Sequence, residues 1–334
     1  MDKIKIAIIG ATGTAYKRII PALENSKLCK ITSIQGRNIN QIVEIKNKFH
    51  IEETYTNIDE MISHNNFDCI YIATPPFLHL DNIFFAAKTN KPIVCEKPLA
   101  CSYKEGLDIY KILKSYPDKN FRIAHQLRHQ KAILDILELI KQGFIGEVLN
   151  VFIQWGFEMN LGAKNAIWKT NPKLQGLGSF NDNGIHLIDI IIFLFGIPIS
   201  VFGKSDNVRL PNVYDNEAAV LIYEKLSVFV NSSQSMKFSG NHLLIYGTKG
   251  SIEAFYSIGE MAIEQVSIRT KDGTNNIKYS TENLYKNEFE DYSKYLLNRS
   301  PWDRGTSLRD GIAALKIIDK IHESVSTKKI ININ

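Results

Sequence analysis

Two side chains that can accept and orient a proton, Asp182 and His186, lie four residues apart at the start of an apolar run. This spacing places both on one face of a helix or on its first turn. The positive end of a helix dipole there favours the neutral imidazole, which is the form that accepts a proton. A structural role is the alternative for each, because Asp182 or Asn183 suits an N-cap and a histidine among apolar residues suits a core.

Asp189 follows one turn later, so the three side chains superficially resemble a set of metal ligands. No second histidine pair or HExxH motif accompanies them. We therefore expect no metal.

Lys97 is a third candidate, in the segment Glu96-Lys97-Pro98 that directly follows an apolar run at residues 92–95. A cation in a strand-end loop held by proline can stabilise a developing alkoxide or pass a proton. The alternative is an ordinary surface ion pair between Glu96 and Lys97.

A glycine-containing turn follows the first apolar run and precedes a helical pattern. Glycine permits a tight turn and lets the backbone approach a pyrophosphate at the positive end of a helix. The usual pattern is G-x-G-x-x-G/A; Thr12 replaces its middle glycine, and Gly13 can supply flexibility one residue later. The alternative is a plain strand-to-helix turn. The residues of this turn expected to bind a dinucleotide are Gly10, Thr12, Gly13, Thr14 and Ala15.

The second strand ends in Gln35-Gly36-Arg37-Asn38, where NAD enzymes usually carry an acidic residue for the ribose hydroxyls. Arg37 suits a 2′-phosphate by charge and by its bidentate geometry. We therefore favour NADP over NAD, the alternative being that Arg37 is an ordinary exposed loop residue.

Secondary-structure elements must position these candidate residues. In the first 125 residues, patterns typical of strands alternate with patterns typical of helices. Strands alternating with helices imply right-handed crossovers and a parallel sheet covered on both faces, a doubly wound Rossmann domain. Strands are predicted at residues 3–9, 28–34, 68–73, 92–95 and 121–125, and helices from residue 15 and at 40–49, 77–88 and 103–115.

From residue 126 on, strand patterns dominate, which predicts an α+β domain with a mainly antiparallel sheet. We assign residues 1–125 to dinucleotide binding and 126–334 to substrate binding and oligomerisation, with the final helix packing back toward the first domain. A hairpin is predicted at 247–250. The other strands are predicted at 147–155, 201–208, 218–223, 227–232 and 243–246, and the helices at 132–142, 288–297 and 307–324.

Composition excludes several classes of protein. The 334 residues carry a net charge of +5 with no basic run, so nucleic acid is not expected as a partner. The longest apolar stretch, 185–199, is interrupted and too short for a membrane span. Without a CxxC pair or a signal peptide, the chain is expected to be a reduced cytoplasmic protein. Its cysteines are Cys29, Cys69, Cys95 and Cys101.

Two segments carry a resemblance to a known family. One joins Ala73-Thr74-Pro75-Pro76 and His79 to Glu96-Lys97-Pro98, and the other is the glycine-rich run 176–189 around Asp182 and His186. They resemble the A-T-P-x-x-x-H turn, the E-K-P motif and the D-x-G-x-H-x-x-D helix start of the Gfo/Idh/MocA family, the group of glucose–fructose oxidoreductase and inositol dehydrogenase. Similarities at 125–128, 146–148, 246–250 and the final helix extend the resemblance over essentially the whole chain.

The resemblance implies that Lys97, Asp182 and His186 are catalytic and that they bind substrate together with Arg128 and Trp168. Trp168-Lys169 stands where the family commonly has Trp-Arg, and lysine lacks the bidentate capacity of arginine. Beyond the glycine turn, the residues expected to bind the cofactor are Gly36, Arg37, Asn38, Ala73, Thr74, Pro75, Pro76, His79, Glu96, Lys97, Gln126 and Trp168.

The implied reaction is reversible hydride transfer between NADP or NAD and a hydroxyl or carbonyl carbon of a sugar, cyclitol or nucleotide-linked sugar. His186 would accept the hydroxyl proton, Asp182 would orient His186 or the substrate, and Lys97 would stabilise charge on the reacting oxygen. An NADPH-dependent imine or biliverdin-type reductase and a non-catalytic dinucleotide-binding regulator remain alternatives. Because the family's second-domain sheet often forms a subunit interface, a homodimer or homotetramer is expected.

Overall fold

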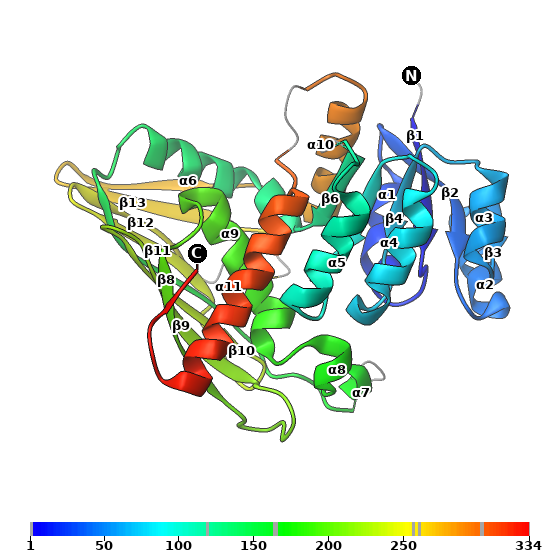
Figure 1. Ribbon diagram of the computed structural model, residues 1–334. Helices are drawn as coiled ribbons and strands as arrows, with labels where there is room; N and C mark the ends of the chain where they lie inside the picture. Colours follow the sequence, from blue (N-terminus) through cyan, green and yellow to red (C-terminus); the bar gives the residue numbers. More distant parts are fainter. Residues whose placement is uncertain are drawn as a thin grey trace. The chain divides into compact units, whose positions relative to one another are not determined.

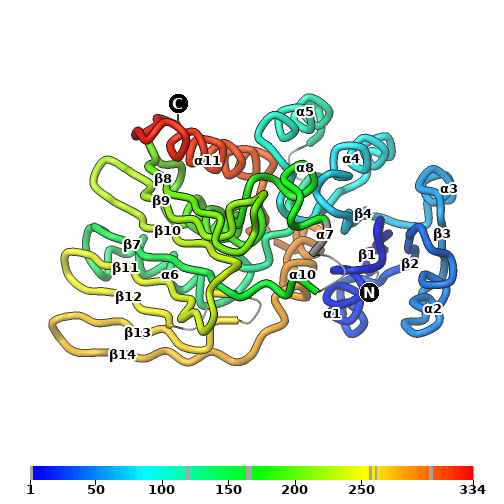
Figure 2. Tube along the Cα trace, turned by 90° about the horizontal axis from the view of Figure 1, so that it is seen from below, coloured from blue at the N-terminus to red at the C-terminus, as the bar shows by residue number. Residues whose placement is uncertain are grey.

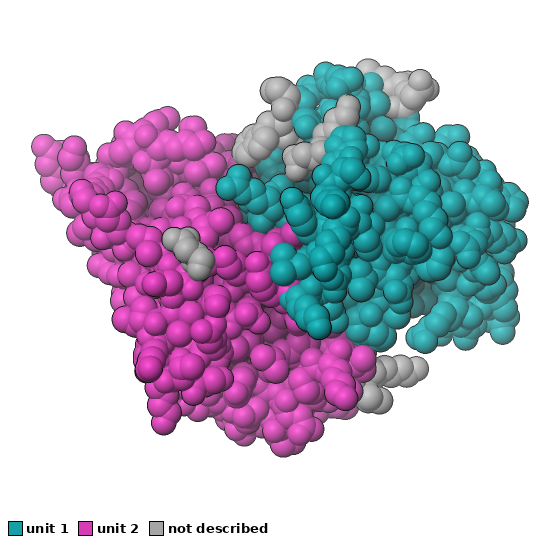
Figure 3. Space-filling view, in the orientation of Figure 1, with its two compact units in different colours: residues 1–100, 104–129, 283–311 teal, residues 101–103, 130–282, 312–334 magenta. Residues whose placement is uncertain are grey.

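The computed structural model describes residues 3–117, 120–162, 166–255, 258–259, 262–300 and 304–333 (Figure 1). The chain divides into two compact units (Figure 3). The first unit comprises Met1–Ala100, Lys104–His129 and Asn283–Gly311, and the second comprises Cys101–Tyr103, Gln130–Glu282 and Ile312–Asn334. Each unit contains its own sheet.

The sheet of the first unit is parallel and has the strand order β3-β2-β1-β4-β5-β6. The last four residues of isoleucine-rich β1 are buried, as expected for a sheet covered on both faces. The order reverses between β1 and β4, so the predicted doubly wound fold is confirmed. The strands are β1 (Ile4–Ile9), β2 (Cys29–Gln35), β3 (Glu53–Tyr55), β4 (Cys69–Ile72), β5 (Ile93–Glu96) and β6 (Phe121–Ala124).

The helices between these strands are α1 (Ile20–Glu24), α2 (Ile39–Phe49), α3 (Ile58–His64), α4 (His79–Ala87) and α5 (Tyr103–Leu113). The predicted elements omit β3 and α3. Strand β3 has only three residues, two of them polar, so it lacks an apolar run. The side chain of Asn57 caps α3 by accepting a 2.7 Å hydrogen bond from the backbone N–H of Asp59.

Helix α10 (Leu284–Leu296) belongs to the first unit although all but the last strand of the second unit precede it in the chain. Its Phe289 and Tyr292 are buried in the core that also contains residues of β1 and β2. The ring centroids of Phe289 and Tyr71 lie 5.0 Å apart. The prediction assigned everything after residue 125 to the second domain. The segment Asn283–Gly311 instead belongs to the first unit, because the aromatic face of α10 completes the first core.

The second unit is built on a nine-stranded sheet with the order β14-β13-β12-β11-β7-β10-β9-β8-β15; Figure 2 shows its strands side by side. Only β7 and β10 pair in parallel among these neighbours. The predicted α+β class and the hairpin at 247–250 are confirmed. The strands are β7 (Val148–Gly156), β8 (Ser200–Asp206), β9 (Asn216–Ile222), β10 (Ser227–Ser233), β11 (His242–Gly247), β12 (Gly250–Phe255), β13 (Gln265–Thr270), β14 (Gly273–Lys278) and β15 (Ile331–Asn332).

Two helices of this unit, α9 and α11, pack against strands of the sheet. Helix α11 packs closely on β8, since a Cβ on Gly203 would lie 2.7 Å from Cγ2 of Ile321. Its first four residues, from Leu308, group with the first unit and the rest with the second. No helix among the described residues is long and apolar enough to cross a membrane. The helices are α6 (Lys131–Lys141), α7 (Ala166–Lys169), α8 (Pro172–Gln175), α9 (Ile185–Phe195) and α11 (Leu308–Thr327).

Candidate active site

In the first unit, the loop after β1 packs against the loop after β4, at the point where the strand order reverses. The backbone N–H of Gly10 donates to the carbonyl oxygen of Gln35 at 3.0 Å. Gly10 has a φ of +85°, and a Cβ there would lie 2.8 Å from Cγ2 of Thr74, so glycine is required. Doubly wound folds bind dinucleotides at this point.

The rest of this loop has the properties that a bound pyrophosphate requires. Thr12, Gly13 and Thr14 are exposed, and the chain turns into a helical segment at buried Ala15. Gly13 has a φ of +65°, and no atom lies within 4 Å of the position of a Cβ there. Gly13 thus provides the open, flexible position that Thr12 lacks.

The end of β2 presents Arg37 to solvent. Gly36 is buried, and a Cβ on it would lie 2.7 Å from Cγ2 of Ile42. The side chain of Asn38 caps α2 by accepting a 3.3 Å hydrogen bond from the backbone N–H of Gln41. Gly36 and Asn38 therefore shape the turn, and the exposed guanidinium of Arg37 lies directly beyond the strand.

His79 holds two strand-end loops together. It is fully buried, with Nε2 2.8 Å from the carbonyl oxygen of Thr74 and Nδ1 3.0 Å from that of Pro98. Burial lowers the pKa of His79, so the ring is neutral at neutral pH and donates to one carbonyl at a time. These bonds place His79 between the loops that bear Thr74 and Lys97, and direct cofactor contact of His79 stays a prediction.

Lys97 follows a buried carboxylate at the end of β5. Glu96 accepts hydrogen bonds from the hydroxyl of Tyr71 and, at 3.2 Å, from the backbone N–H of Lys97. Burial raises the pKa of Glu96. Glu96 is therefore not half of a surface ion pair, and its side chain supports the loop. Lys97 is partly exposed at the carboxyl end of β5, and folds of this kind bind ligands at the carboxyl ends of their strands.

Arg128 is turned into the first unit, in the short helical segment Gln126–His129 after β6. It is 2% exposed, and its guanidinium lies 3.2 Å from a carboxylate oxygen of Asp310. Gln126 is also buried. The substrate contact of Arg128 and the cofactor contact of Gln126 stay predictions.

In the second unit, Asp182 and His186 lie on one continuous helix, residues 180–195, which we call the site helix. Its first five residues, Phe180–Gly184, are π-helical and run directly into α9. Such turns often occur at functional sites. Because the helix begins at residue 180, Asp182 lies in its first turn and His186 in its second. The dipole therefore favours the Asp182 carboxylate and acts on His186 less than predicted.

Two side chains hold the same carboxylate oxygen of Asp182. Nζ of Lys169 lies 2.6 Å and Nε2 of Gln234 lies 2.7 Å from Oδ2. The side chains of Lys169 and Asp182 are 20% and 10% exposed. Gln234 is buried immediately after β10. Lys169 thus compensates the charge of the carboxylate, and both partners fix its direction. Asp182 therefore does more than cap a helix.

Aromatic packing fixes the His186 ring. The ring centroid lies 5.3 Å from that of Trp155 on β7, at an interplanar angle of 33°. Asn183 donates a 2.7 Å hydrogen bond from Nδ2 to the carbonyl oxygen of Trp155. Trp168 is partly exposed on α7, next to Lys169. The site helix, β7 and α7 thus carry one cluster of polar and aromatic side chains.

The structure adds two residues to those predicted from the sequence. Lys169 was noted only as a departure from Trp-Arg, and Gln234 was not considered, since the run Ser-Ser-Gln-Ser matches no motif. Among the described residues, no group of three acidic, histidine or cysteine side chains is placed to hold a metal ion.

Comparison with known proteins agrees with this geometry. The model of the oxidoreductase family with an NAD-binding Rossmann fold, GFO_IDH_MocA, matches residues 4–124, and that of the GFO/IDH/MocA C-terminal domain matches residues 133–253. An uncharacterised oxidoreductase of Schizosaccharomyces pombe is 31% identical over 272 residues, which cover 76% of this chain and 71% of the relative. The chain therefore belongs to the Gfo/Idh/MocA oxidoreductases and has an NAD(P)-binding Rossmann domain.

Two further similarities extend over the full length. The D-xylose 1-dehydrogenase [NADP(+)] of Haloarcula marismortui is 23% identical over 348 residues, covering 100% of this chain and 94% of the relative. The aldose-aldose oxidoreductase from Caulobacter crescentus, solved in complex with glycerol, superimposes with a TM-score of 0.88 at 20% identity. That match covers 99% of this chain and 100% of the other, so the two-part fold is shared throughout.

Proposed function

We propose that the protein transfers hydride reversibly between a nicotinamide cofactor and the hydroxyl- or carbonyl-bearing carbon of a sugar, cyclitol or nucleotide-linked sugar. The observation that carries the proposal is the cluster on the site helix. There, Asp182 is held by Lys169 and Gln234, four residues from the packed ring of His186. The sugar class is supported by the relatives named as D-xylose dehydrogenase and aldose-aldose oxidoreductase.

Each of these residues has a task in the oxidative direction. The bound nicotinamide supplies the acceptor for the hydride. A ring nitrogen of His186 takes the proton of the substrate hydroxyl, while the Asp182 carboxylate orients His186 or a neighbouring hydroxyl. The ammonium group of Lys97 stabilises negative charge on the reacting oxygen.

A substrate panel tests this proposal. NADP+ and NAD+ are each offered with D-xylose, D-glucose, myo-inositol and UDP-glucose, and reduced nicotinamide is followed by absorbance. Turnover of at least one of these is the expected result. Turnover only of imines or biliverdin with NADPH would favour the reductase alternative. Dinucleotide binding without turnover of any compound would favour a regulator.

The loop formed by Gly10, Thr12, Gly13, Thr14 and Ala15 would hold the pyrophosphate, and Arg37 the 2′-phosphate of NADP. We expect NADPH to bind more tightly than NADH. Replacing Arg37 by alanine is expected to weaken NADPH binding about tenfold or more, since it removes a charged hydrogen bond, while NADH binding changes little.

Nicotinamide fluorescence during titration at low salt measures both affinities. Lys27→Ala is the matched control, because Lys27 is exposed just before β2, at the opposite end of the strand from Arg37. An equal loss of NADPH and NADH affinity in Arg37→Ala would contradict the assignment, and a preference of the parent protein for NADH would overturn it.

We also propose a homodimer or homotetramer that forms through the open face of the nine-stranded sheet. The pairing registers place five apolar residues in one row across β8, β9, β10, β7 and β11. The rings of Phe152 and Phe229 stack in it at 4.7 Å. An exposed apolar row of this kind fits a self-complementary subunit interface. The row is Phe202, Val220, Phe229, Phe152 and Leu244.

Replacing Phe229 by glutamate is expected to give a monomer, because the new charge would lie in the centre of the apolar row. Light scattering at micromolar concentration measures the mass, which is 37.9 kDa for a single chain. Phe84→Glu is the control, since Phe84 on α4 is exposed in the first unit and should leave the assembly intact. A parent protein with the mass of one chain would reject the oligomer.

Cysteine chemistry supports a location in the cytoplasm. All four cysteines are buried, and none forms a disulfide bond. Thiols that form no disulfide are typical of proteins in a reducing compartment.

A further inference from the structure

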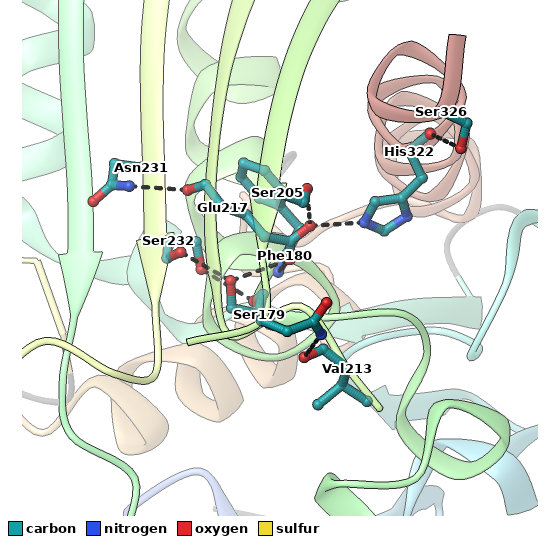
Figure 4. Close-up of polar contacts among 10 residues, drawn as sticks. Ser179, Phe180, Ser205, Val213, Glu217, Asn231, Ser232, His322 and Ser326 are labelled. Atoms are coloured by element: carbon teal, nitrogen blue, oxygen red, sulfur yellow. Dashed lines mark hydrogen bonds and ion pairs between the residues drawn. The ribbon is translucent and has the colours of Figure 1, made fainter. Parts of the chain in front are cut away.

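A fully buried carboxylate, Glu217 on β9, accepts hydrogen bonds on both of its oxygens (Figure 4). Oε2 accepts from the backbone N–H of Phe180 at 2.7 Å and lies 3.1 Å from the hydroxyl of Ser179. Oε1 accepts from the hydroxyl of Ser205 at 2.9 Å and lies 2.8 Å from Nε2 of His322 on α11. A carboxylate that no solvent reaches needs hydrogen-bond donors from the protein, and these four contacts meet that need.

The bond to Phe180 reaches the first turn of the site helix. Backbone N–H groups at a helix start have no partner within the helix, and a carboxylate there also meets the positive end of the dipole. Phe180 comes two residues before Asp182. Glu217 on β9 therefore contacts the helical turn that carries Asp182, a proposed catalytic residue.

Gly178 makes this approach possible. A Cβ on Gly178 would lie 2.4 Å from Oε2 of Glu217, closer than any side-chain carbon fits. The preceding turn is tied to the same region, since the backbone N–H of Ser179 donates to the carbonyl oxygen of Tyr214 at 2.7 Å. The glycine-containing segment before the site helix thus leaves room for the carboxylate of Glu217.

The same turn is tied to a second strand. The hydroxyl of Ser179 lies 2.8 Å from the carbonyl oxygen of Ser232 on β10, and the hydroxyl of Ser232 donates back to the carbonyl oxygen of Ser179 at 3.1 Å. Ser179 has one hydroxyl hydrogen to share between Ser232 and Glu217. The N–H of Phe180 is therefore the contact that depends on Glu217 most directly.

We infer that Glu217 is a positioning residue of the active site: it anchors the first turn of the site helix and thereby places Asp182, and His322 and Ser205 hold the anchor in place. The inference rests on the function proposed above for Asp182. Small displacements of a catalytic group lower rates strongly, about 100-fold for 1 Å.

The protein offers a matched control in Asp215, which is also fully buried and lies two residues before Glu217. Its carboxylate accepts from the backbone N–H groups of Val208, Arg209 and Leu210, at 2.6, 2.7 and 3.0 Å. Ser235 donates to it as well. Asp215 thus organises a different loop with a similar number of bonds.

The test is hydrogen–deuterium exchange of the full chain without substrate. Glu217→Ala is expected to speed exchange of the amides of residues 180–186 about tenfold or more, because a hydrogen bond to a charged group is lost. Glu217→Gln keeps an oxygen for the N–H of Phe180 and should restore slow exchange. Asp215→Ala should speed exchange at residues 208–210 and leave 180–186 unchanged. Unchanged exchange at 180–186 in Glu217→Ala, or an equal effect in Asp215→Ala, would overturn the anchor.

A variant with a smaller disturbance keeps the test decisive if Glu217→Ala fails to fold. His322→Ala removes only the partner of Oε1, and exchange at 180–186 should rise by a smaller factor. With a substrate found by the panel above, Glu217→Ala should lower kcat about tenfold or more, with cofactor affinity unchanged. Absence of any substrate would count against the proposed function, whereas the exchange rates alone decide whether Glu217 holds the helix.

Discussion

Replacing His186 by alanine is expected to lower turnover about 100-fold or more, the usual scale of general acid–base catalysis. The ring is the proposed proton acceptor, and its packing against Trp155 fixes its position on the site helix. Alanine at Asp182 or Lys97 should have effects of similar size, because one orients the reacting groups and the other stabilises the charge that forms on oxygen.

Steady-state kinetics with the substrate found by the panel measures these effects on kcat and KM separately. His64→Ala and Lys104→Met are suitable controls, since both side chains are exposed on helices of the first unit. Thermal unfolding should show that the variants remain folded. If the three alanine variants turned over like the parent, the catalytic assignment would be wrong.

Replacing Lys169 by methionine is expected to lower kcat about 10- to 100-fold. The substitution keeps the length of the side chain but leaves Asp182, with its side chain only 10% exposed, without the cation that lies 2.6 Å from Oδ2. Breaking a buried ion pair leaves an uncompensated charge, which costs about 3–5 kcal/mol when burial is complete and less at this exposure. The carboxylate is then expected to move or to take up a proton.

Lys169→Arg separates charge from shape in this pair. Arginine retains the positive charge and is the residue that the family commonly carries after this tryptophan, so most of the activity should return. Asp182→Asn should match Lys169→Met in its loss of kcat, and the double variant should lose little more, because the two residues act as a unit. Independent, additive losses would show that Lys169 does not act through Asp182.

Sequence patterns predicted the first unit well because its buried parallel strands are continuous apolar runs. The short strand β3 was not predicted, since three residues, two of them polar, carry no such pattern. Helix α10 was recognised in part, but its membership in the first core depends on Phe289 meeting Tyr71, a contact between residues more than 200 positions apart. Local patterns contain no information on such pairings.

In the candidate site, too, local patterns predicted some residues and missed contacts between distant ones. Motifs predicted Lys97, Asp182 and His186 as catalytic residues by residue type and spacing. They did not predict that His79 and Arg128 are buried. Neither burial nor the ion pair of Arg128 with Asp310 follows from the local sequence. Gln234 reaches Asp182 only because β10 ends beside the site helix, a consequence of the sheet order and not of any motif.

In the proposed reaction, hydride leaves a carbon of a polyhydroxylated substrate for the nicotinamide ring. The most direct measurement uses a sugar deuterated at the reacting carbon, with mass spectrometry of the reduced cofactor. Deuterium is expected to appear in the reduced nicotinamide, and His186→Ala should slow its transfer about 100-fold or more. Reduced cofactor without deuterium, or no transfer from any compound of the panel by a protein that binds the cofactor, would contradict it.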